Sequence, residues 1–106
     1  MPARFMRVLV FFDLPTKTKS DKRDYILFRT HLIKMGFLMM QESLYSKLVL
    51  NGTMQESVER DICKHCPRKG IVQMMSITEK QYSSIKVVTG KVSTDVVNNN
   101  ERVVIL

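Results

Sequence analysis

The apolar and polar positions of the chain divide it into short segments that alternate between strand and helix patterns. The first apolar run starts at Met6 and is continuous from Val8 to Phe12. Such a run predicts a strand buried on both faces, which places it in the middle of a sheet. Pro15 has no N–H to donate to a neighbouring strand, so the strand must end before it. Asp13 therefore stands at the carboxyl end of the predicted central strand.

A helix is predicted over residues 22–35, because apolar side chains recur there every three or four positions. Ser20 or Asp21 is the expected N-terminal cap, and Gly36 is the expected stop. The predicted apolar stripe consists of Tyr25, Phe28, Leu32 and Met35, widened by Ile33.

A second helix is predicted from the capping-box pattern Thr53-x-x-Glu56 up to the residues before Pro67. Its buried stripe is predicted to be Met54, Val58 and Ile62. Another capping box, Thr78-x-x-Gln81, predicts a short helix or turn over residues 79–84. The remaining apolar segments are predicted to be strands, over residues 37–50, 71–77, 85–88 and 102–106.

This order of elements predicts a ferredoxin-like α+β sandwich, βαββαβ, with both helices on one face and an additional C-terminal strand. The bare sheet face and the apolar terminal strand 102–106 both need a cover. We therefore predict a homodimer that exchanges the last strand. Residues 1–90 would form the ferredoxin-like domain, and residues 91–106 a loop and strand packing on the partner protomer.

Charge adds a candidate partner. The formal net charge is +7, and residues 1–35 hold eight lysines or arginines against three acids. A basic surface of this kind favours a polyanion such as nucleic acid. With 106 residues the chain suits one domain, and it has neither an apolar run long enough to cross a bilayer nor a secretion signal. We expect no membrane association, a cytoplasmic location and two reduced cysteines.

Two groups of residues carry candidate chemistry. Asp13 could be a ligand for Mg²⁺, which prefers one or two carboxylates together with waters and phosphate oxygens. It could equally well accept backbone amides in the turn after the strand. The candidate phosphate-binding residues, which could instead form a solvated charged surface, are Lys17, Lys19, Lys22, Arg23 and Arg29.

Two further motifs are interpreted as structural. Cys63-Lys64-His65-Cys66 is half of a zinc knuckle, but structural zinc takes four ligands, and His31 is the only other candidate in the sequence. Ordinary packing at a helix end is therefore favoured for the two cysteines. Ser43, Tyr45 and Ser46 could hydrogen-bond a phosphate, although cross-strand pairing is the favoured interpretation.

Several segments, in their order and spacing, resemble CRISPR-associated protein two of the type II systems. These segments are Arg7–Pro15, Phe28-Arg29 with Leu32 and Gly36-Phe37, Gln41–Leu48, and Gly70 leading to Thr78–Tyr82. The resemblance implies a ferredoxin-like homodimer that takes part in spacer acquisition. It implies that the dimer binds double-stranded DNA and bridges two dimers of an integrase, CRISPR-associated protein one.

The same resemblance implies a Mg²⁺-dependent endonuclease that acts on RNA or double-stranded DNA, with Asp13 as catalytic residue and metal ligand. Lys17, Lys19, Lys22 and Arg23 occupy the place where that family contacts the DNA backbone. Two functions therefore remain open: a DNA-binding scaffold whose cleavage is incidental, and a metal-dependent endoribonuclease that uses paired Asp13 residues. Toxin ribonucleases of the virulence-associated D type share the architecture and represent the second alternative.

Overall fold

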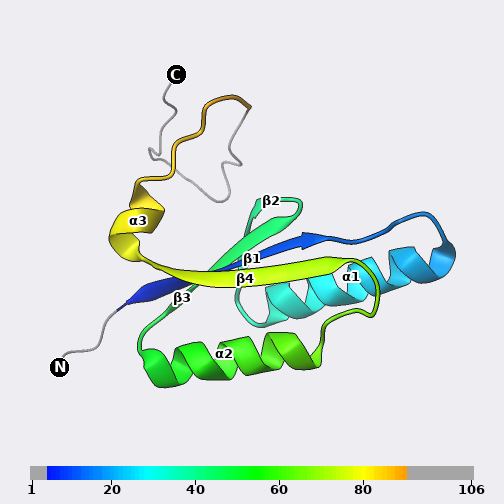
Figure 1. The fold of residues 1–106 in the computed structure, drawn as a ribbon, viewed down its shortest axis with the longest axis horizontal. Helices are drawn as coiled ribbons and strands as arrows, with labels where there is room; N and C mark the ends of the chain where they lie inside the picture. Colours follow the sequence, from blue (N-terminus) through cyan, green and yellow to red (C-terminus); the bar gives the residue numbers. More distant parts are fainter. Residues whose placement is uncertain (1–4, 91–106) are drawn as a thin grey trace.

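The computed structural model of the chain describes residues 5–90. The predicted strand 102–106, and the whole predicted segment 91–106, lie outside the described residues. Figure 1 shows the elements β1 (Met6–Asp13), α1 (Lys19–Lys34), β2 (Leu38–Gln41), β3 (Leu44–Val49), α2 (Gly52–Lys64), β4 (Ile71–Thr78) and α3 (Glu79–Ser83). None of the helices in this described part is long and apolar enough to cross a membrane.

The four strands form one antiparallel sheet in the order β2-β3-β1-β4. The strand β1 lies in the interior of the sheet, between β3 and β4, as its continuous apolar run predicts. The helices α1 and α2 both lie against one face of the sheet (Figure 1). This arrangement confirms the predicted ferredoxin-like α+β fold, since each helix connects two parallel strands that leave room for a third between them.

The core forms between that sheet face and the two helices. Along β1, Val8, Val10 and Phe12 point to the helices, because successive side chains of a strand alternate between its faces. Phe28 and Leu32 of α1 contact this row, as do Val58 and Ile62 of α2; the other buried members of the cluster are Phe37, Tyr45 and Val49. Arg7, Leu9, Phe11 and Asp13 consequently lie on the opposite side, which we call the open face.

The prediction of one long strand over residues 37–50 is wrong. The segment forms a hairpin, in which β2 pairs with β3 around a turn at Glu42 and Ser43. The three polar residues that interrupt the apolar run, residues 41–43, thus mark a reversal of the chain. A continuous strand would have left the sheet one strand short, whereas the hairpin supplies both β2 and β3.

The predicted strand over residues 85–88 is also wrong. This segment follows α3 and is irregular, with a single bridge residue at Val87 and with Ile85 and Val88 exposed. The capping box at Thr78 is confirmed, because its side chain accepts from the backbone of Gln81. That cap starts a helix at the end of β4 and leads the chain away from the sheet edge.

Helix α1 begins three residues earlier than predicted. Its cap is Thr18, whose hydroxyl accepts from the amide of Asp21, while the Asp21 carboxylate accepts from the amide of Thr18. The prediction that Ser20 or Asp21 caps this helix is therefore wrong, although Asp21 contributes the reciprocal half of the capping box. Three of the predicted basic residues, Lys19, Lys22 and Arg23, fall in the first two turns as a result.

Helix α2 is capped by Asn51 and not by Thr53. The Asn51 side chain accepts from the amide of Met54 at 2.8 Å, so the helix starts at Gly52, the second residue of the Asn-Gly pair. The predicted buried stripe is confirmed for Val58 and Ile62, with Met54 partly buried.

The end of α1 follows its prediction. Gly36 has a φ of +98°, and the amides of Gly36 and Phe37 donate to the carbonyls of Ile33 and Leu32. This pair of bonds is a Schellman motif, and Phe37 and Leu32 are both in the core cluster. Ile33 itself is 47% exposed, so the prediction that it widens the buried stripe is wrong.

Candidate functional site

Asp13 is the last residue of β1, and its side chain is exposed at the edge of the open face. The residue before it, Phe12, is buried and contacts three aromatic rings, those of Tyr25, Phe28 and Tyr45, at centroid distances of 6.1, 5.3 and 5.6 Å. Because neighbouring side chains on a strand point to opposite faces, this buried anchor directs the Asp13 carboxylate away from the helices.

The hairpin turn is held beside Asp13. The amide of Phe12 donates to the carbonyl of Ser43 at 3.0 Å, so the turn between β2 and β3 lies at the end of β1. The Tyr25 hydroxyl of α1 donates to the carbonyl of Glu42 in the same turn, and burial raises the pKa of this tyrosine. A hollow of about 400 Å³ results, lined by Phe11, Phe12, Asp13, Gln41, Ser43, Leu44, Ile71 and Gln73.

Gly70 fixes the other side of this site. Its φ is +87°, and a Cβ atom placed on it would lie 2.6 Å from the Asp13 carbonyl oxygen and 3.0 Å from the Leu14 Cα. The chain entering β4 therefore passes directly against the backbone at Asp13, at a distance that only glycine permits. The backbone on both sides of the carboxylate is thus closely packed.

The predicted basic residues divide into two groups. Lys17, Lys19, Lys22 and Arg23 lie in the loop after β1 and the start of α1, are exposed, and have no carboxylate within ion-pair distance among the residues described. Arg29 lies further along α1, and its Nε donates to the buried Tyr45 hydroxyl at 2.9 Å. The structure therefore brings four of the five predicted residues to one end of the molecule and places Arg29 apart from them.

Lys69 adds to this basic end, although the sequence analysis did not include it. Its Nζ lies 3.5 Å from Oδ1 of Asp21, the buried acid of the α1 capping box. The pKa of Asp21 is lowered, first because the Thr18 amide donates to its carboxylate and also because Lys69 lies nearby, while its burial acts in the opposite direction. Asp21 thus stays ionised and ties the α2–β4 connection to the start of the basic helix.

The open face carries apolar side chains across three strands. Leu38 of β2 and Ile71 and Met75 of β4 are each at least half exposed, whereas Leu9 in the middle is buried. At one end of this face, the Arg7 guanidinium pairs with Glu79 and lies 4.3 Å over the Tyr82 ring, which fixes α3 against β1. Exposed apolar side chains gathered on one sheet face are typical of a protein interface.

The site can be compared with the needs of Mg²⁺. Asp13 offers hard oxygen ligands that face solvent, and the side chains of Gln41, Ser43 and Gln73 in the same hollow add neutral oxygens. Asp13 is the one carboxylate among the residues that line this hollow. One chain therefore supplies only part of a Mg²⁺ site. The residues of the hollow would suit the ion if a second protein molecule added another carboxylate.

Sequence reasoning did not identify Gln41 and Gln73 as site residues. Ser43 was considered only as a mid-strand hydroxyl, and it lies instead in the hairpin turn, while Tyr45 is fully buried in the core and Ser46 on the open face. These positions depend on the strand register, in which Phe11 faces Gln73 and Asp13 faces Ile71, and no local sequence signal encodes that register.

The fold and the site define a small split-βαβ domain that exposes an acid at the end of its first strand, beside a basic helix start and an apolar sheet face. The model of the family described as CRISPR associated protein Cas2 matches residues 6–85. The chain belongs to this family, and the resemblance noted in the sequence is confirmed.

Curated relatives cover nearly the whole chain. A protein of Treponema denticola named CRISPR-associated endoribonuclease Cas2 is 46% identical over 95% of this chain and all of its own length. A protein of the same name from Ligilactobacillus salivarius is 40% identical over 95% of this chain and all of its own length. One from Streptococcus mutans is 35% identical, over 95% of this chain and 93% of its own length.

Proposed function

We propose that this chain is a subunit of CRISPR adaptation that works as a homodimer, binds double-stranded DNA, and bridges dimers of the integrase, CRISPR-associated protein one. Membership of the Cas2 family, joined to the exposed side chains of Lys17, Lys19, Lys22 and Arg23 at one end of the domain, is the observation that carries this proposal. On this proposal the protein acts in the cytoplasm, where its two free cysteines, Cys63 and Cys66, would stay reduced.

The dimer is supported by the apolar open face. Burial of Leu38, Ile71 and Met75 against a second copy would remove exposed apolar surface from water, which is the main favourable term in association. The exchange of residues 102–106 between the two protomers, predicted from the sequence and outside the described residues, remains part of this proposal. Equilibrium sedimentation should give the mass of two chains, and the mass of one chain at micromolar concentration would contradict the proposal.

Binding of DNA is supported by Lys17, Lys19, Lys22 and Arg23. Contacts from such side chains to phosphates are independent of base sequence and release counterions, so the affinity should fall steeply with salt. Changing Lys17 and Lys19 together to Gln should weaken binding of a DNA duplex and flatten its salt dependence. The matched control, Lys80→Gln on the exposed surface of α3, should leave both unchanged.

A second candidate function is metal-dependent endoribonuclease activity. The word "endoribonuclease" in the names of the relatives and the exposed Asp13 carboxylate together favour it. Two copies of Asp13, brought together across a dimer axis, would hold one Mg²⁺. When bound there, the ion would activate a water molecule and neutralise charge on a phosphodiester.

This chain's own residues have distinct parts in that reaction. Phe12 and Gly70 keep the backbone at Asp13 in place, so the carboxylate stays at the end of β1, where it would receive the ion. Gln41, Ser43 and Gln73 line the hollow in which the phosphate would lie, and their side chains can donate hydrogen bonds to its oxygens. The basic end positions the nucleic acid without reading its sequence.

One experiment separates the two functions. Spacer integration and Mg²⁺-dependent cleavage are measured for the wild type and Asp13→Asn, in mixtures reconstituted with the integrase. The scaffold predicts intact integration and lost cleavage, whereas an essential nuclease predicts the loss of both. Glu56→Gln, an exposed acid on α2, is the matched control and should change neither. If a folded, dimeric wild type neither binds duplex DNA nor supports integration, the scaffold proposal fails.

A further inference from the structure

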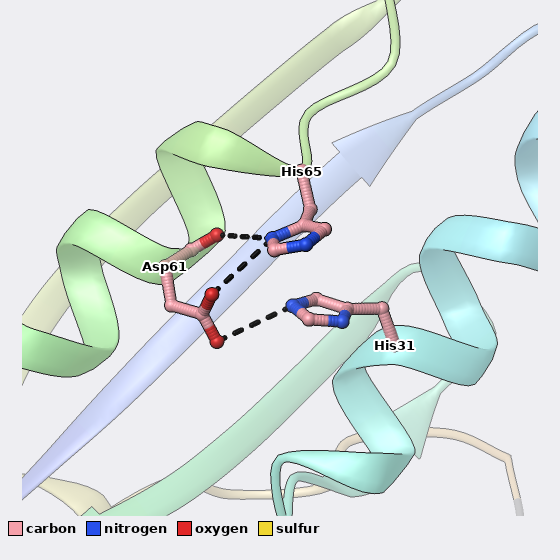
Figure 2. Close-up of side chains that lie close together, drawn as sticks. All are labelled: His31, Asp61 and His65. Atoms are coloured by element: carbon pink, nitrogen blue, oxygen red, sulfur yellow. Dashed lines mark hydrogen bonds and ion pairs between the residues drawn. The ribbon is translucent and has the colours of Figure 1, made fainter.

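Both histidines of the sequence meet at one place on the helix layer, where Asp61 joins them. Figure 2 shows His31 on α1, Asp61 on α2, and His65 at the C-terminal cap of α2, with both rings next to the carboxylate. The sequence places His31 thirty-odd positions from the Cys63–Cys66 motif, so only the packing of α1 beside α2 reveals this cluster. It lies on the side of the sheet opposite to Asp13.

The distances within the cluster are short. Oδ2 of Asp61 lies 3.4 Å from Nε2 of His31, and Oδ1 of Asp61 lies 3.2 Å from Nδ1 of His65. The two imidazole rings are stacked, with centroids 3.8 Å apart and planes 25° from parallel. One ligand atom from each residue can be chosen so that all three lie within 4.8 Å of one another.

These separations suit a common metal ion. Bonds of about 2.0–2.1 Å in tetrahedral geometry place ligand atoms about 3.3 Å apart, and each of the two nitrogen–oxygen distances, measured to different oxygens of Asp61, is close to that value. The Nδ1 atom of His65 also lies 2.9 Å from the backbone carbonyl oxygen of Asp61, and an ion bound through this nitrogen would replace that contact. The stacked rings must turn about their Cβ–Cγ bonds for both lone pairs to converge on one ion. That torsion is broad for histidine, and the hollow beside the rings leaves space for the movement.

His31 provides a second observation that points to a ligand. Its Nε2 atom is shielded from solvent and, although it lies near Asp61, it has no hydrogen bond of acceptable geometry within the described part of the chain. Buried polar atoms without a partner are rare and cost free energy. A metal ion in the cluster would satisfy this nitrogen directly.

The donor set decides the class of metal. Two imidazole nitrogens and one carboxylate oxygen suit zinc, cobalt or nickel, whereas Mg²⁺ prefers oxygen ligands alone. A hollow of about 500 Å³, lined in part by His31, His65 and Cys66, adjoins the cluster and admits water as a further ligand. The Cys66 thiol is occupied differently, because it donates to the carbonyl of Ile62 and burial raises its pKa.

We propose that His31, Asp61 and His65 bind one divalent transition-metal ion of the zinc class, which joins α1 to α2. The ion would stabilise the helix layer, because it binds the folded arrangement of two helices and not the unfolded chain. The proposal is independent of the scaffold and nuclease functions, since the cluster shares no residue with the hollow at Asp13.

The test uses the full chain without a histidine tag, after treatment with a chelator. Titration calorimetry with Zn²⁺ should find one ion per chain, and Co²⁺ should give the visible absorption bands of a low-coordinate nitrogen–oxygen site. Zn²⁺ should also raise the thermal midpoint, and a chelator should reverse the increase. Absence of saturable binding by the folded wild type would overturn the proposal.

Substitutions then assign the ligands. His31→Ala and His65→Ala should each weaken Zn²⁺ binding at least about tenfold, because loss of even an outer-sphere partner costs that much. His31→Gln, which keeps a polar side chain, serves if His31→Ala fails to fold. Glu56→Gln should bind Zn²⁺ as the wild type does. If binding survives the histidine changes and is lost when Cys63 and Cys66 are changed to Ser, the thiols are the ligands and the proposal is wrong.

Discussion

Replacement of Gly70 by Ala tests how closely the chain is packed around the carboxylate at the end of β1. Two costs combine at this position. A left-handed conformation costs a residue with a Cβ about 1–2 kcal/mol, and the φ of Gly70 is +87°. The new methyl would also lie 2.6 Å from the Asp13 carbonyl oxygen and 3.0 Å from the Leu14 Cα, which are backbone atoms that cannot turn aside.

The magnitude follows from these two terms. Forcing a methyl into a closely packed site costs about 1–3 kcal/mol. Alanine restricts the unfolded chain more than glycine does, which favours the folded state by about 0.4–1 kcal/mol. We therefore expect Gly70→Ala to lower the free energy of unfolding by about 2–4 kcal/mol. Gly36→Ala is the matched control: its φ is +98°, but its close neighbour is the mobile Lys47 Nζ, so a loss of only about 0.5–1 kcal/mol is expected.

The assay is equilibrium unfolding in urea, followed by circular dichroism, with all variants at one protein concentration because dimerisation would couple to stability. Equal slopes are needed for the midpoints to report stability alone. Equal losses in Gly70→Ala and Gly36→Ala would refute the argument, since they would show that the contact with Asp13 and Leu14 adds nothing. A stabilised Gly70→Ala would refute the left-handed conformation as well.

Three further predictions concern the helices that carry the basic end and the core. Folding lowers the pKa of Asp21, so the ionised carboxylate stabilises the protein above the ordinary pKa, and this stabilisation is lost as the pH falls through the lowered pKa. The difference in unfolding free energy between the wild type and Asp21→Asn, measured in urea, should therefore be larger at about pH 7 than at about pH 3. Thr18→Ala should cost about 1 kcal/mol in the same assay, and Asn51→Ala at the start of α2 a similar amount, whereas unchanged midpoints would mean that these caps contribute nothing. Tyr45→Phe removes the hydroxyl that accepts from Arg29 and should cost about 0.5–1.5 kcal/mol, with no loss when Arg29 is already Ala.

The sequence was sufficient for the features that depend on local pattern. The continuous apolar run of β1 identified the central strand, and the spacing of Phe28, Leu32, Val58 and Ile62 identified the helix faces that form the core. Gly36 marked the end of α1. Each of these signals acts within a few residues, so no knowledge of distant contacts was needed.

The errors arose where a local signal had two solutions. The polar residues 41–43 can interrupt a strand or reverse it, and only the need for four paired strands decides for the hairpin. The apolar segment 85–88 resembles a strand, yet the helix started by the Thr78 cap takes it away from the described sheet. Thr18 was passed over as a cap because the loop contains several residues able to cap a helix.

The sites were harder to predict than the fold, because they join segments distant in sequence. Asp13 was recognised from its place after a strand, but its neighbours Gln41 and Gln73 depend on register and on the hairpin. His31 and His65 were each visible in the sequence, but ordinary packing was favoured over a metal site because Cys63–Cys66 is only half of a zinc motif. The packing of α1 on α2 brings the imidazoles together and leaves the thiols outside the cluster.

The aromatic anchor at Phe12 has a consequence for how this protein can change over time. Three rings hold Phe12, and none of them belongs to the loop between β1 and α1 that carries Lys17. If the loop binds nucleic acid as proposed, substitutions in it would change the affinity while the carboxylate of Asp13 keeps its direction. The proposed affinity and the proposed chemistry would then be able to evolve separately, although their residues are neighbours in the chain, because the backbone at Asp13 is anchored by the core.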